Sequence, residues 1–500
     1  MSSTVPSPAS PNSSMLWDGL RRFDKLPSWL TAAVTLGLVA AALTSEVPEF
    51  ASGALVLLGC DLERLRLKRG YWIGPYQLTV APAGGVGEPS QVGVEGRLYP
   101  PGALPQRPDQ QAAVAFGTDD WRYQLPELGL DFRAEPAGAG LGEVTLPSMP
   151  VLTDPVAARE LLEATMRAAS PAYAELRLAA CTPRVVRYKP GSRATIVYHL
   201  EYPLETDAEA RGWPEVVIAK TFRGDKGANA WAGMRSLWDS PLGRGGTVQI
   251  AEPLGYLPDL PMLLQGPVGQ ERTLKELIRA ALDAGTPDLL GEVDAYVAKT
   301  AAGLATLHTS GASIGKPVTI DDKLAELHEV ADTLSVNVPE LAGAADALLA
   351  RLEELAAVHP ADPPVPSHGS FRPDQVLLSK GGIGFVDFDA ACHAEPARDL
   401  GLFRATVKDV GLTRKAEDGV PEPPHEVQLA TYERLDRLND AFLAGYLEVA
   451  PPVSPVRLLL WETAEVLDYA LSCWRKVKPE KLAANMLMLE RQVNGPLDVA

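Results

Sequence analysis

The stretch "HGSFRPDQVLLSKGGIGFVDFD", residues 368–389, carries the pattern on which the fold prediction rests. Two apolar runs flank a Gly-Gly turn, which is typical of a short β-hairpin. Gln375 stands just before the first run, and Asp387 follows the second, twelve residues later. A side-chain amide and a carboxylate on neighbouring strand ends offer the hard oxygen ligands that Mg²⁺ on a nucleotide phosphate prefers. The stretch therefore predicts a metal site formed by Gln375 and Asp387.

The size and charge of the chain limit what surrounds this hairpin. The chain has 500 residues, which suggests about three folding units. Lysine and arginine number 46 against 64 acidic residues, a formal net charge of −18. A negative field of that size repels phosphate backbones and argues against nucleic-acid binding. No feature of the sequence indicates an oligomeric state.

The cysteines and the N-terminal region bear on where the protein works. The four cysteines are far apart, which argues against disulfides or a zinc site and favours a reducing, cytoplasmic location. Residues 1–15 are rich in Ser and Pro, which predicts disorder, and no signal peptide is recognisable. The apolar segment Trp29–Leu43 is shorter than the roughly 20 residues that a spanning helix needs, so we expect a buried Ala/Leu-rich helix and no membrane partner.

The order of expected elements indicates the fold class. Asp154 and Pro155 open a helix as N-cap and first helical residue. Five strand-like runs then lie between Arg184 and Gly269, and helical periodicity dominates after Gln270. We expect an α+β fold with a small β-rich lobe, a larger helical lobe and a cleft between them. The expected parts are a tail (1–15), an α+β extension (16–150), the β-rich lobe (151–270) and the helical lobe (271–500).

The extension resembles part of the β-rich lobe. Both Leu57–Pro82 and Arg177–Pro203 read as an arginine-rich strand, a turn and a second strand, and Cys60 falls on Cys181. Gln91–Tyr99 then parallels the third strand but lacks its lysine. One interpretation is a degenerate copy of the β lobe that keeps the scaffold without the chemistry. The alternative is coincidence of strand composition. The copy hypothesis predicts an antiparallel sheet there.

With Lys220 the chain shows a third residue suited to nucleotide chemistry. It ends the apolar run "VVIAK", and a strand lysine can reach nucleotide phosphates from the roof of a cleft. Together with residues 368–403, this run resembles the aminoglycoside phosphotransferase family, which has a protein-kinase-like bilobal fold. The resemblance covers about Leu176 to Trp474, and "EPARDLGLF" stands in place of the family's D-P-x-x-D-L-A.

This resemblance implies roles for individual residues. Asp387 and Gln375 match the metal-binding Asp and Asn, and Lys220 matches the phosphate-binding lysine. Asp399 matches the Asp that organises the loop by hydrogen bonds. The segment Met262–Gly269 matches the hinge that pairs with adenine, and Lys189–Arg193 matches the turn that covers the nucleotide. The implied nucleotide-contacting residues within these two segments are Gly191, Ser192, Gln265 and Pro267.

The chain departs from the family at the catalytic base. Ser370 stands where the family has an Asp that takes the proton from the substrate hydroxyl. The neutral hydroxyl of a serine cannot take this proton at pH 7. The segment 226–240 should be the helix whose Glu pairs with Lys220, yet it contains no Glu. Asp374 and Asp389 are nearby carboxylates that could replace the missing base. The alternative is that Asp374 is a solvated acid of the loop and that Asp389 makes a structural contact in its loop. His308 and His393 are interpreted as packing or loop histidines.

These features predict an ATP- and Mg²⁺-dependent phosphotransferase that acts on a hydroxyl of a small molecule. General-base assistance typically contributes 10²–10⁴-fold, so losing the Asp slows transfer without ending it. The alternative is a pseudokinase, a nucleotide-binding or scaffold module that transfers nothing. A purely structural protein is disfavoured because Asp387 is retained in its context. The sequence does not identify the acceptor.

Overall fold

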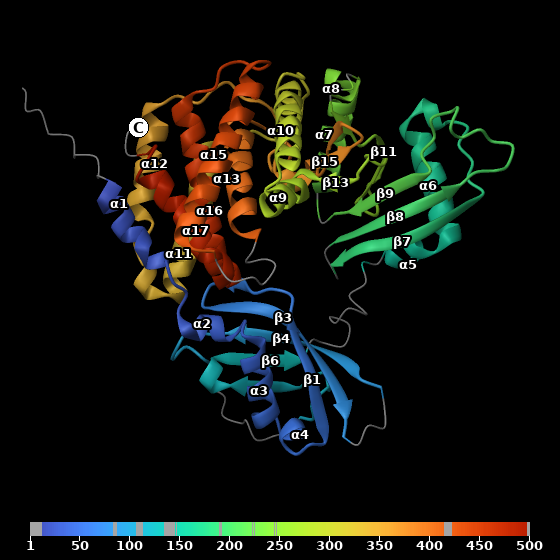
Figure 1. Cartoon of the computed structure of the whole chain (residues 1–500). Helices are drawn as coiled ribbons and strands as arrows, with labels where there is room; N and C mark the ends of the chain where they lie inside the picture. Colours follow the sequence, from blue (N-terminus) through green and yellow to red (C-terminus); the bar gives the residue numbers. More distant parts are fainter. Residues whose placement is uncertain are drawn as a thin grey trace, which may run out of the picture.

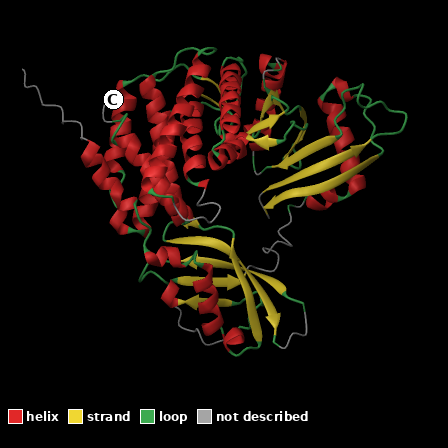
Figure 2. Cartoon of the chain, viewed as in Figure 1, coloured by secondary structure: helices red, strands yellow, loops and turns green. Residues whose placement is uncertain are grey.

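The computed structural model contains three parts (Figure 1). It describes residues 13–497 except 84–87, 107–113, 135–145, 147, 190–192, 223, 225, 245, 247 and 415–422. An N-terminal sheet domain lies beneath a helical lobe, and a second sheet lies to one side of that lobe (Figure 2). The α+β, kinase-like arrangement of a β-rich and a helical lobe is confirmed.

The N-terminal domain is an antiparallel sheet covered by short helices. Its strands lie in the order β1-β3-β4-β6-β5, with β2 added to β3. The strands are β1 (Leu55–Leu62), β2 (Arg66–Lys68), β3 (Tyr71–Pro82), β4 (Ser90–Leu98), β5 (Arg122–Leu125) and β6 (Leu130–Ala134). The helices are α1 (Ser13–Leu20), α2 (Ser28–Ala32), α3 (Leu36–Glu46) and α4 (Pro48–Ala51).

Alternation along β3 explains how this sheet forms its core. Every second residue from Trp72 to Val80 is buried, Gly74 included, as expected for a strand with one covered face. At Gly74 a Cβ would lie 2.3 Å from the carbonyl oxygen of Arg64. The glycine therefore lets the segment between β1 and β2 cross close to β3.

The N-terminal domain shares a continuous hydrophobic core with the helical lobe. The indole nitrogen of Trp72 donates to the carbonyl of Trp474 at 3.0 Å, and that of Trp474 donates to the carbonyl of Phe23 at 3.0 Å. Asn337 accepts from the backbone of Gly70 and donates to that of Lys68. Hydrogen bonds from two buried tryptophan side chains and from Asn337 thus hold the N-terminal domain against the helical lobe.

The strands and first helices of the β-rich lobe pack mostly in a core of their own, whereas Leu237, Leu242 and Leu263 of this lobe belong to the core of the helical lobe. Asp154 caps the long helix of the β-rich lobe by accepting from the backbone of Val156 and Ala157, as predicted. Its helices are α5 (Met149–Thr153), α6 (Pro155–Ala169), α7 (Lys226–Asp239) and α8 (Pro241–Arg244). Its strands are β7 (Ala180–Lys189), β8 (Arg193–Glu201), β9 (Val216–Thr221), β11 (Pro253–Leu257) and β12 (Met262–Gln265), in the order β11-β12-β9-β8-β7. The five predicted strands are all present.

The two large sheets have the same topology. If β2 is set aside, the strands of the N-terminal sheet lie in chain order first, second, third, fifth, fourth, and so do those of the β-rich lobe. All neighbouring pairs in both sheets are antiparallel. The predicted antiparallel sheet over Leu57–Tyr99 is confirmed. Equal strand order is also what the copy hypothesis requires, although the copying itself stays a prediction.

The helical lobe surrounds the predicted hairpin. Its helices are α9 (Leu274–Ala284), α10 (Pro287–His308), α11 (Ile320–Asn337), α12 (Asp346–Val358), α13 (Ala397–Leu412), α15 (His425–Leu447), α16 (Pro455–Lys476) and α17 (Pro479–Val493). The hairpin is β15 (Val376–Ser379) and β16 (Gly382–Phe385), flanked by β13 (Arg272–Thr273) and β10 (Gln249–Ile250). A second small pair joins β14 (Val365–Ser367) and β17 (Cys392–Ala394), on either side of the Ser370 loop.

The N-terminal segment differs from expectation at two points. The described chain begins in α1 at Ser13, inside the predicted tail, and α1 contacts α12 and α17 of the helical lobe (Figure 1). Residues 16–46 are long and apolar enough to span a membrane by length and composition. The expected single helix over Trp29–Leu43 is wrong, because α2 ends at Ala32 and α3 begins at Leu36. Tyr76 donates to the Ala33 carbonyl at 2.8 Å, which occupies an acceptor that a continuous helix would use.

Candidate active site

Asp399 holds the loop that carries Ser370. Its carboxylate accepts from the backbone of His368 at 2.6 Å and of Gly369 at 2.8 Å. Gly369 has φ +76°, and a Cβ there would lie 2.0 Å from the carbonyl oxygen of Ala390. Only glycine fits this left-handed, crowded position. The role implied for Asp399 therefore matches its contacts.

His308 contacts the carboxylate of Asp399. This buried ring lies with Nε2 3.2 Å from the Asp399 carboxylate and Nδ1 2.8 Å from the Tyr446 hydroxyl. Burial raises the pKa of Asp399, but His308, His368 and Arg398 together bring it below its ordinary value. His308 is therefore more than a packing residue, because it helps to keep the loop-organising carboxylate charged.

His368 fixes the orientation of the Ser370 hydroxyl. Its Nε2 lies 3.0 Å from the Val386 carbonyl, which can only accept, so Nε2 carries the proton. Burial lowers the pKa of His368, which favours the neutral ring and leaves Nδ1 as an acceptor. The Ser370 Oγ lies 3.4 Å from this Nδ1. Ser370 thus points its hydroxyl hydrogen at an imidazole and has only lone pairs to offer to other groups.

Gln375 presents an unpaired oxygen beside Ser370. Its amide nitrogen donates to Ser370 Oγ at 3.3 Å, and its Oε1 is buried without a hydrogen-bond partner among the described residues. A buried orphan carbonyl is costly unless something occupies it. An amide oxygen is a suitable ligand for Mg²⁺, so this atom fits the predicted metal role.

Lys220 bridges the β-rich lobe to two carboxylates of the loop after β16. Its ammonium lies 2.9 Å from Asp387 and 3.6 Å from Asp389. Burial raises the pKa of Asp387, but the charge and hydrogen bond of Lys220 bring it below the ordinary value. Burial and the neighbouring Asp387 raise the pKa of Asp389 despite Lys220. The pair therefore consists of one firmly ionised carboxylate and one that holds its proton more readily.

The missing helix glutamate has no substitute on α7. Asp239 at its end forms an i,i+4 pair with Arg235 at 3.9 Å, and Asp225 lies outside the described residues. Lys220 instead takes its partners from the loop that is predicted to bind the metal.

Two protein oxygens suit a metal that also binds phosphate. Asp387 and the orphan Oε1 of Gln375 line the same cleft. In the part of the chain that the structure describes, no group of three or more His, Cys, Asp or Glu side chains could hold a metal by itself. Mg²⁺ bound to a nucleotide takes one or two carboxylates plus phosphate and water, so this sparse donor set fits Mg²⁺ and does not suit a structural metal.

The cleft has a volume of about 1320 Å³ and brings together the two predicted metal ligands and two of the three candidate catalytic residues. Ser370, Gln375, Asp387 and Asp389 all line it. Its wall also includes Glu63, Arg64, Leu65 and Arg66 of the N-terminal domain. Sequence reasoning missed this contribution, since nothing local to β1 or β2 indicates that the segment between them reaches a cleft about 300 residues away.

Some predicted residues lie elsewhere. Asp374 is exposed, lies 3.6 Å from Arg372 and does not line the cleft. Gln265 is buried in β12, where it pairs with Ile218, and Pro267 follows it exposed; neither lines the cleft. Gly191 and Ser192 lie outside the described residues. His393 holds a loop, with Nδ1 3.0 Å from the Ile314 carbonyl, as expected of a loop histidine.

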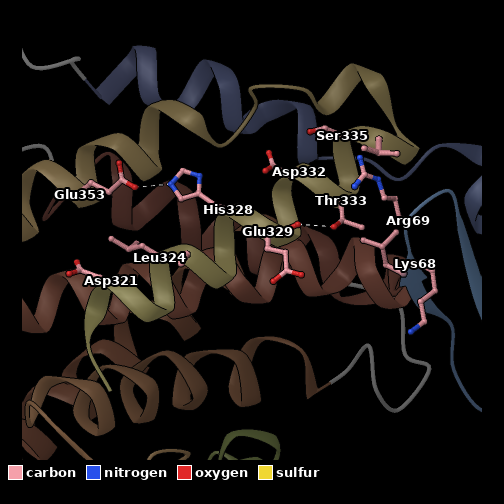
Figure 3. Close-up of a pocket in the computed structure, with 13 residues that line it drawn as sticks. Lys68, Arg69, Asp321, Leu324, His328, Glu329, Asp332, Thr333, Ser335 and Glu353 are labelled. Atoms are coloured by element: carbon pink, nitrogen blue, oxygen red, sulfur yellow. Dashed lines mark hydrogen bonds and ion pairs between the residues drawn. The ribbon is translucent and has the colours of Figure 1, made fainter. Parts of the chain in front are cut away.

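A second hollow of about 1260 Å³ lies between the β2–β3 turn and α11 (Figure 3). Lys68 and Arg69 approach it from the N-terminal domain, and His328 lies 2.8 Å from Glu353 on its opposite wall. It shares no lining residue with the cleft that contains Ser370. Ser370, Gln375, Asp387 and Asp389 therefore line one of these two hollows and not the other.

Comparison with known proteins gives one family match. Residues 272–452 match the model of the phosphotransferase enzyme family. No curated protein sequence matches the chain.

Several solved structures of small-molecule kinases are similar at low identity. A glucosamine kinase (crystal form A) is 16% identical with a TM-score of 0.46, covering 93% of this chain and 98% of that one. Choline kinase from Cryptosporidium parvum is 12% identical with a TM-score of 0.42, covering 67% and 94%. An aminoglycoside phosphotransferase from Streptomyces rimosus is 15% identical with a TM-score of 0.32, covering 58% and 92%.

Proposed function

From the match of residues 272–452 to the phosphotransferase enzyme family, we propose that the protein transfers the γ-phosphoryl group of ATP, with Mg²⁺, to a hydroxyl of a small molecule. The observation that carries the proposal is the convergence of Lys220, Asp387 and the orphan Gln375 oxygen around Ser370. A lysine from one lobe and oxygen ligands from the other are the arrangement that phosphoryl transfer needs.

Each residue has a task that its chemistry allows. Lys220 would move from the carboxylates to the nucleotide phosphates when these enter the cleft. Asp387 and Gln375 Oε1 would hold Mg²⁺, which supplies positive charge to the transferred phosphoryl group. Asp389 is the candidate proton acceptor, because it lines the cleft and its raised pKa makes it a better base than an ordinary aspartate. Asp374 is disfavoured for this task because its side chain lies outside the cleft wall.

The experiment is ATP binding and turnover on the intact chain. Calorimetry should detect ATP binding that is tighter with Mg²⁺ than with chelator. A panel of hydroxylated acceptors should then yield ADP and a phosphorylated product for at least one member. If ATP does not bind in a Mg²⁺-dependent way, the proposal is wrong.

The second candidate is a nucleotide-binding module without transfer. Ser370 in place of a base, and the lack of a Glu on α7, favour it. It predicts Mg²⁺-dependent ATP binding with background turnover both in the wild type and in Ser370→Asp, whereas the enzyme proposal predicts turnover above background.

Localisation and partners follow the same proposal. We propose a cytoplasmic protein that acts on a small molecule, without nucleic acid or membrane as partner. Its chain-wide negative charge and the absence of closely spaced cysteines support this.

A further inference from the structure

The cleft is electropositive although the chain carries a net charge of −18. Among the described residues, three carboxylates line it: Glu63, Asp387 and Asp389. Eight cationic side chains of the described residues line it: Arg64, Arg66, Arg187, Arg193, Lys226, Lys316, Arg372 and Lys476. A surplus of cations in one hollow of an acidic protein focuses a local field that attracts anions.

The cations divide between the two sides of the cleft. Arg187, Arg193 and Lys226 belong to the β-rich lobe, as does Lys220, and are suited to the phosphates of a nucleotide. The other five come from the N-terminal domain and the helical lobe. Ser370 also belongs to the helical lobe, so these five are the cations available to an acceptor held at the proposed transfer site.

Arg64 and Arg66 belong to a domain that packs firmly against the helical lobe. The N-terminal domain shares its core with the helical lobe, whereas the strands of the β-rich lobe pack in a separate core. The Trp72–Trp474 hydrogen bond of 3.0 Å connects β3, which pairs with the strand of Arg66, to the end of α16 just before Lys476. Arg64, Arg66 and Lys476 therefore keep a fixed position relative to Ser370 if the β-rich lobe moves.

These side chains are poorly matched by the protein's own acids. Arg66, Lys316 and Lys476 form no ion pair with any described residue. Arg64 has only its sequence neighbour Glu63, with Nε 3.7 Å from the carboxylate, and this Nε is buried without a hydrogen bond among the described residues. A buried guanidinium nitrogen without an acceptor is costly in a free protein and is satisfied when an anion binds.

We propose that the acceptor is a hydroxyl compound that already carries a phosphate monoester, held by Arg64, Arg66, Lys316 and Lys476. Arginine and lysine bind phosphate by charge-assisted hydrogen bonds, and four cations match a dianion better than the single charge of a carboxylate. The proposal rests on the proposed function and names its substrate class. It excludes amino sugars and other cations, which this wall would repel.

The reaction balances with this acceptor. The acceptor's hydroxyl oxygen forms a P–O bond while the bond between the γ-phosphorus and the β–γ bridging oxygen of ATP breaks. The hydroxyl proton leaves to a carboxylate, for which Asp389 is the candidate, and ADP and a bisphosphorylated product are released.

The test measures acceptor-side binding with the nucleotide site filled. The intact protein is saturated with Mg²⁺ and a non-hydrolysable ATP analogue, and calorimetry compares glucose 6-phosphate with glucose, glucosamine and gluconate. We expect glucose 6-phosphate to bind at least about tenfold more tightly than the other three, which corresponds to about 1.4 kcal/mol. Equal or tighter binding of glucose or glucosamine would overturn the proposal, and tighter binding of gluconate would replace phosphate by carboxylate.

Charge-reversal variants locate the binding surface. Arg64→Glu and Lys476→Glu should each weaken glucose 6-phosphate binding at least about tenfold and leave the affinity for the ATP analogue within about twofold. Arg69→Glu is the matched control, because this exposed arginine of the same domain lines the other hollow (Figure 3) and should change neither affinity. If Arg64→Glu is unfolded by circular dichroism, Arg64→Gln takes its place.

The outcomes separate this proposal from the one before it. Loss of the affinity for the ATP analogue in Arg64→Glu and Lys476→Glu, with phosphate-ester binding unchanged, would assign these cations to the nucleotide and refute the acceptor class. If the analogue itself does not bind to the wild type, the phosphotransferase proposal fails. The preference for glucose 6-phosphate is then measured on the free protein, where it still supports or overturns the anionic site.

Discussion

Lys220 on β9 and Asp387 after β16 form a 2.9 Å ion pair that joins the β-rich lobe to the helical lobe. The same two side chains are the predicted ligands of phosphate and metal. A nucleotide with Mg²⁺ must therefore break the Lys220–Asp387 ion pair when it binds. The phosphate would then replace Asp387 as the partner of Lys220, and Mg²⁺ would replace Lys220 as the partner of Asp387.

Asp387→Asn removes the firmly ionised carboxylate from this arrangement. We expect Mg²⁺-dependent ATP affinity to fall at least about tenfold while the fold persists, because an amide binds Mg²⁺ more weakly than a carboxylate does. Calorimetry with and without Mg²⁺ measures the change. Asp374→Asn is the control, since this exposed carboxylate does not line the cleft. Unchanged Mg²⁺ dependence in folded Asp387→Asn would assign the metal to Asp389.

Ser370→Asp returns a carboxylate to the loop that Asp399 holds. Gln375 can donate to the new side chain as it does to Ser370, so we expect the backbone to accept it. Since Asp389 is the proposed proton acceptor, a second carboxylate at residue 370 should leave turnover unchanged or lower it, because like charges would crowd near the predicted metal site. Ser370→Asn has the same shape without the charge and should give no rise. A rise of about 10²–10⁴-fold in the Asp variant alone would mean that no other group takes the proton in the wild type, against the role proposed for Asp389.

The raised pKa of Asp389 predicts that turnover falls when the pH is lowered, which gives the pH–rate profile an acid limb. A base must be deprotonated to act, so turnover should increase with pH through a pKa above that of an ordinary aspartate. Asp389→Asn should lower kcat by about 10²–10⁴-fold and abolish this limb. The profile is recorded only where circular dichroism shows a native protein. An acid limb that persists in Asp389→Asn would exclude this residue as the base.

Glu462 in α16 makes stability depend on acid pH. It is buried and accepts from Arg404 at 2.7 Å and Lys408 at 2.9 Å. Burial raises its pKa, but the two cations outweigh this and hold it at about 2. Since the unfolded carboxyl titrates near 4.5, its contribution is fully present above that pH and is lost as pH falls towards about 2.

Glu462→Gln should therefore destabilise the protein at neutral pH by up to about 3–5 kcal/mol, because it leaves two buried cations with only the more exposed carboxylates of Asp436 and Asp440. The difference from wild type should shrink as the pH is lowered from about 4.5. Urea unfolding across this range measures both effects. Asp440→Asn is the matched control, since this mostly exposed partner of Arg404 should change stability by less than about 1 kcal/mol. A constant difference at all pH values would mean that Glu462 does not titrate as its surroundings suggest.

The elements that sequence could predict are those set by local pattern. Alternating apolar residues, the Gly-Gly turn and the Asp154 cap fixed the strands of the β-rich lobe, the hairpin and the start of α6. The spacing of Ser370, Gln375 and Asp387 was enough to place them together, because a hairpin brings its two ends to one place.

The features that sequence reasoning missed depend on contacts distant in the chain. The hydrogen bond from Tyr76 to Ala33 breaks an apolar segment that reads as one helix. Arg64 and Arg66 reach the cleft only because the N-terminal sheet is fixed to the end of α16 through Trp72. His308 gave no local sign of its role, since its partners Asp399 and Tyr446 lie 91 and 138 residues away.

The continuous core between the N-terminal sheet and the helical lobe has a consequence for unfolding. Cooperative units follow shared cores and not chain order. The N-terminal domain and the helical lobe should melt together as one discontinuous unit, whereas the strands of the β-rich lobe, with their separate core, can open on their own. In thermodynamic terms the β-rich lobe is an insertion within a larger cooperative domain, and truncating the chain before α5 would expose the core of the part that remains.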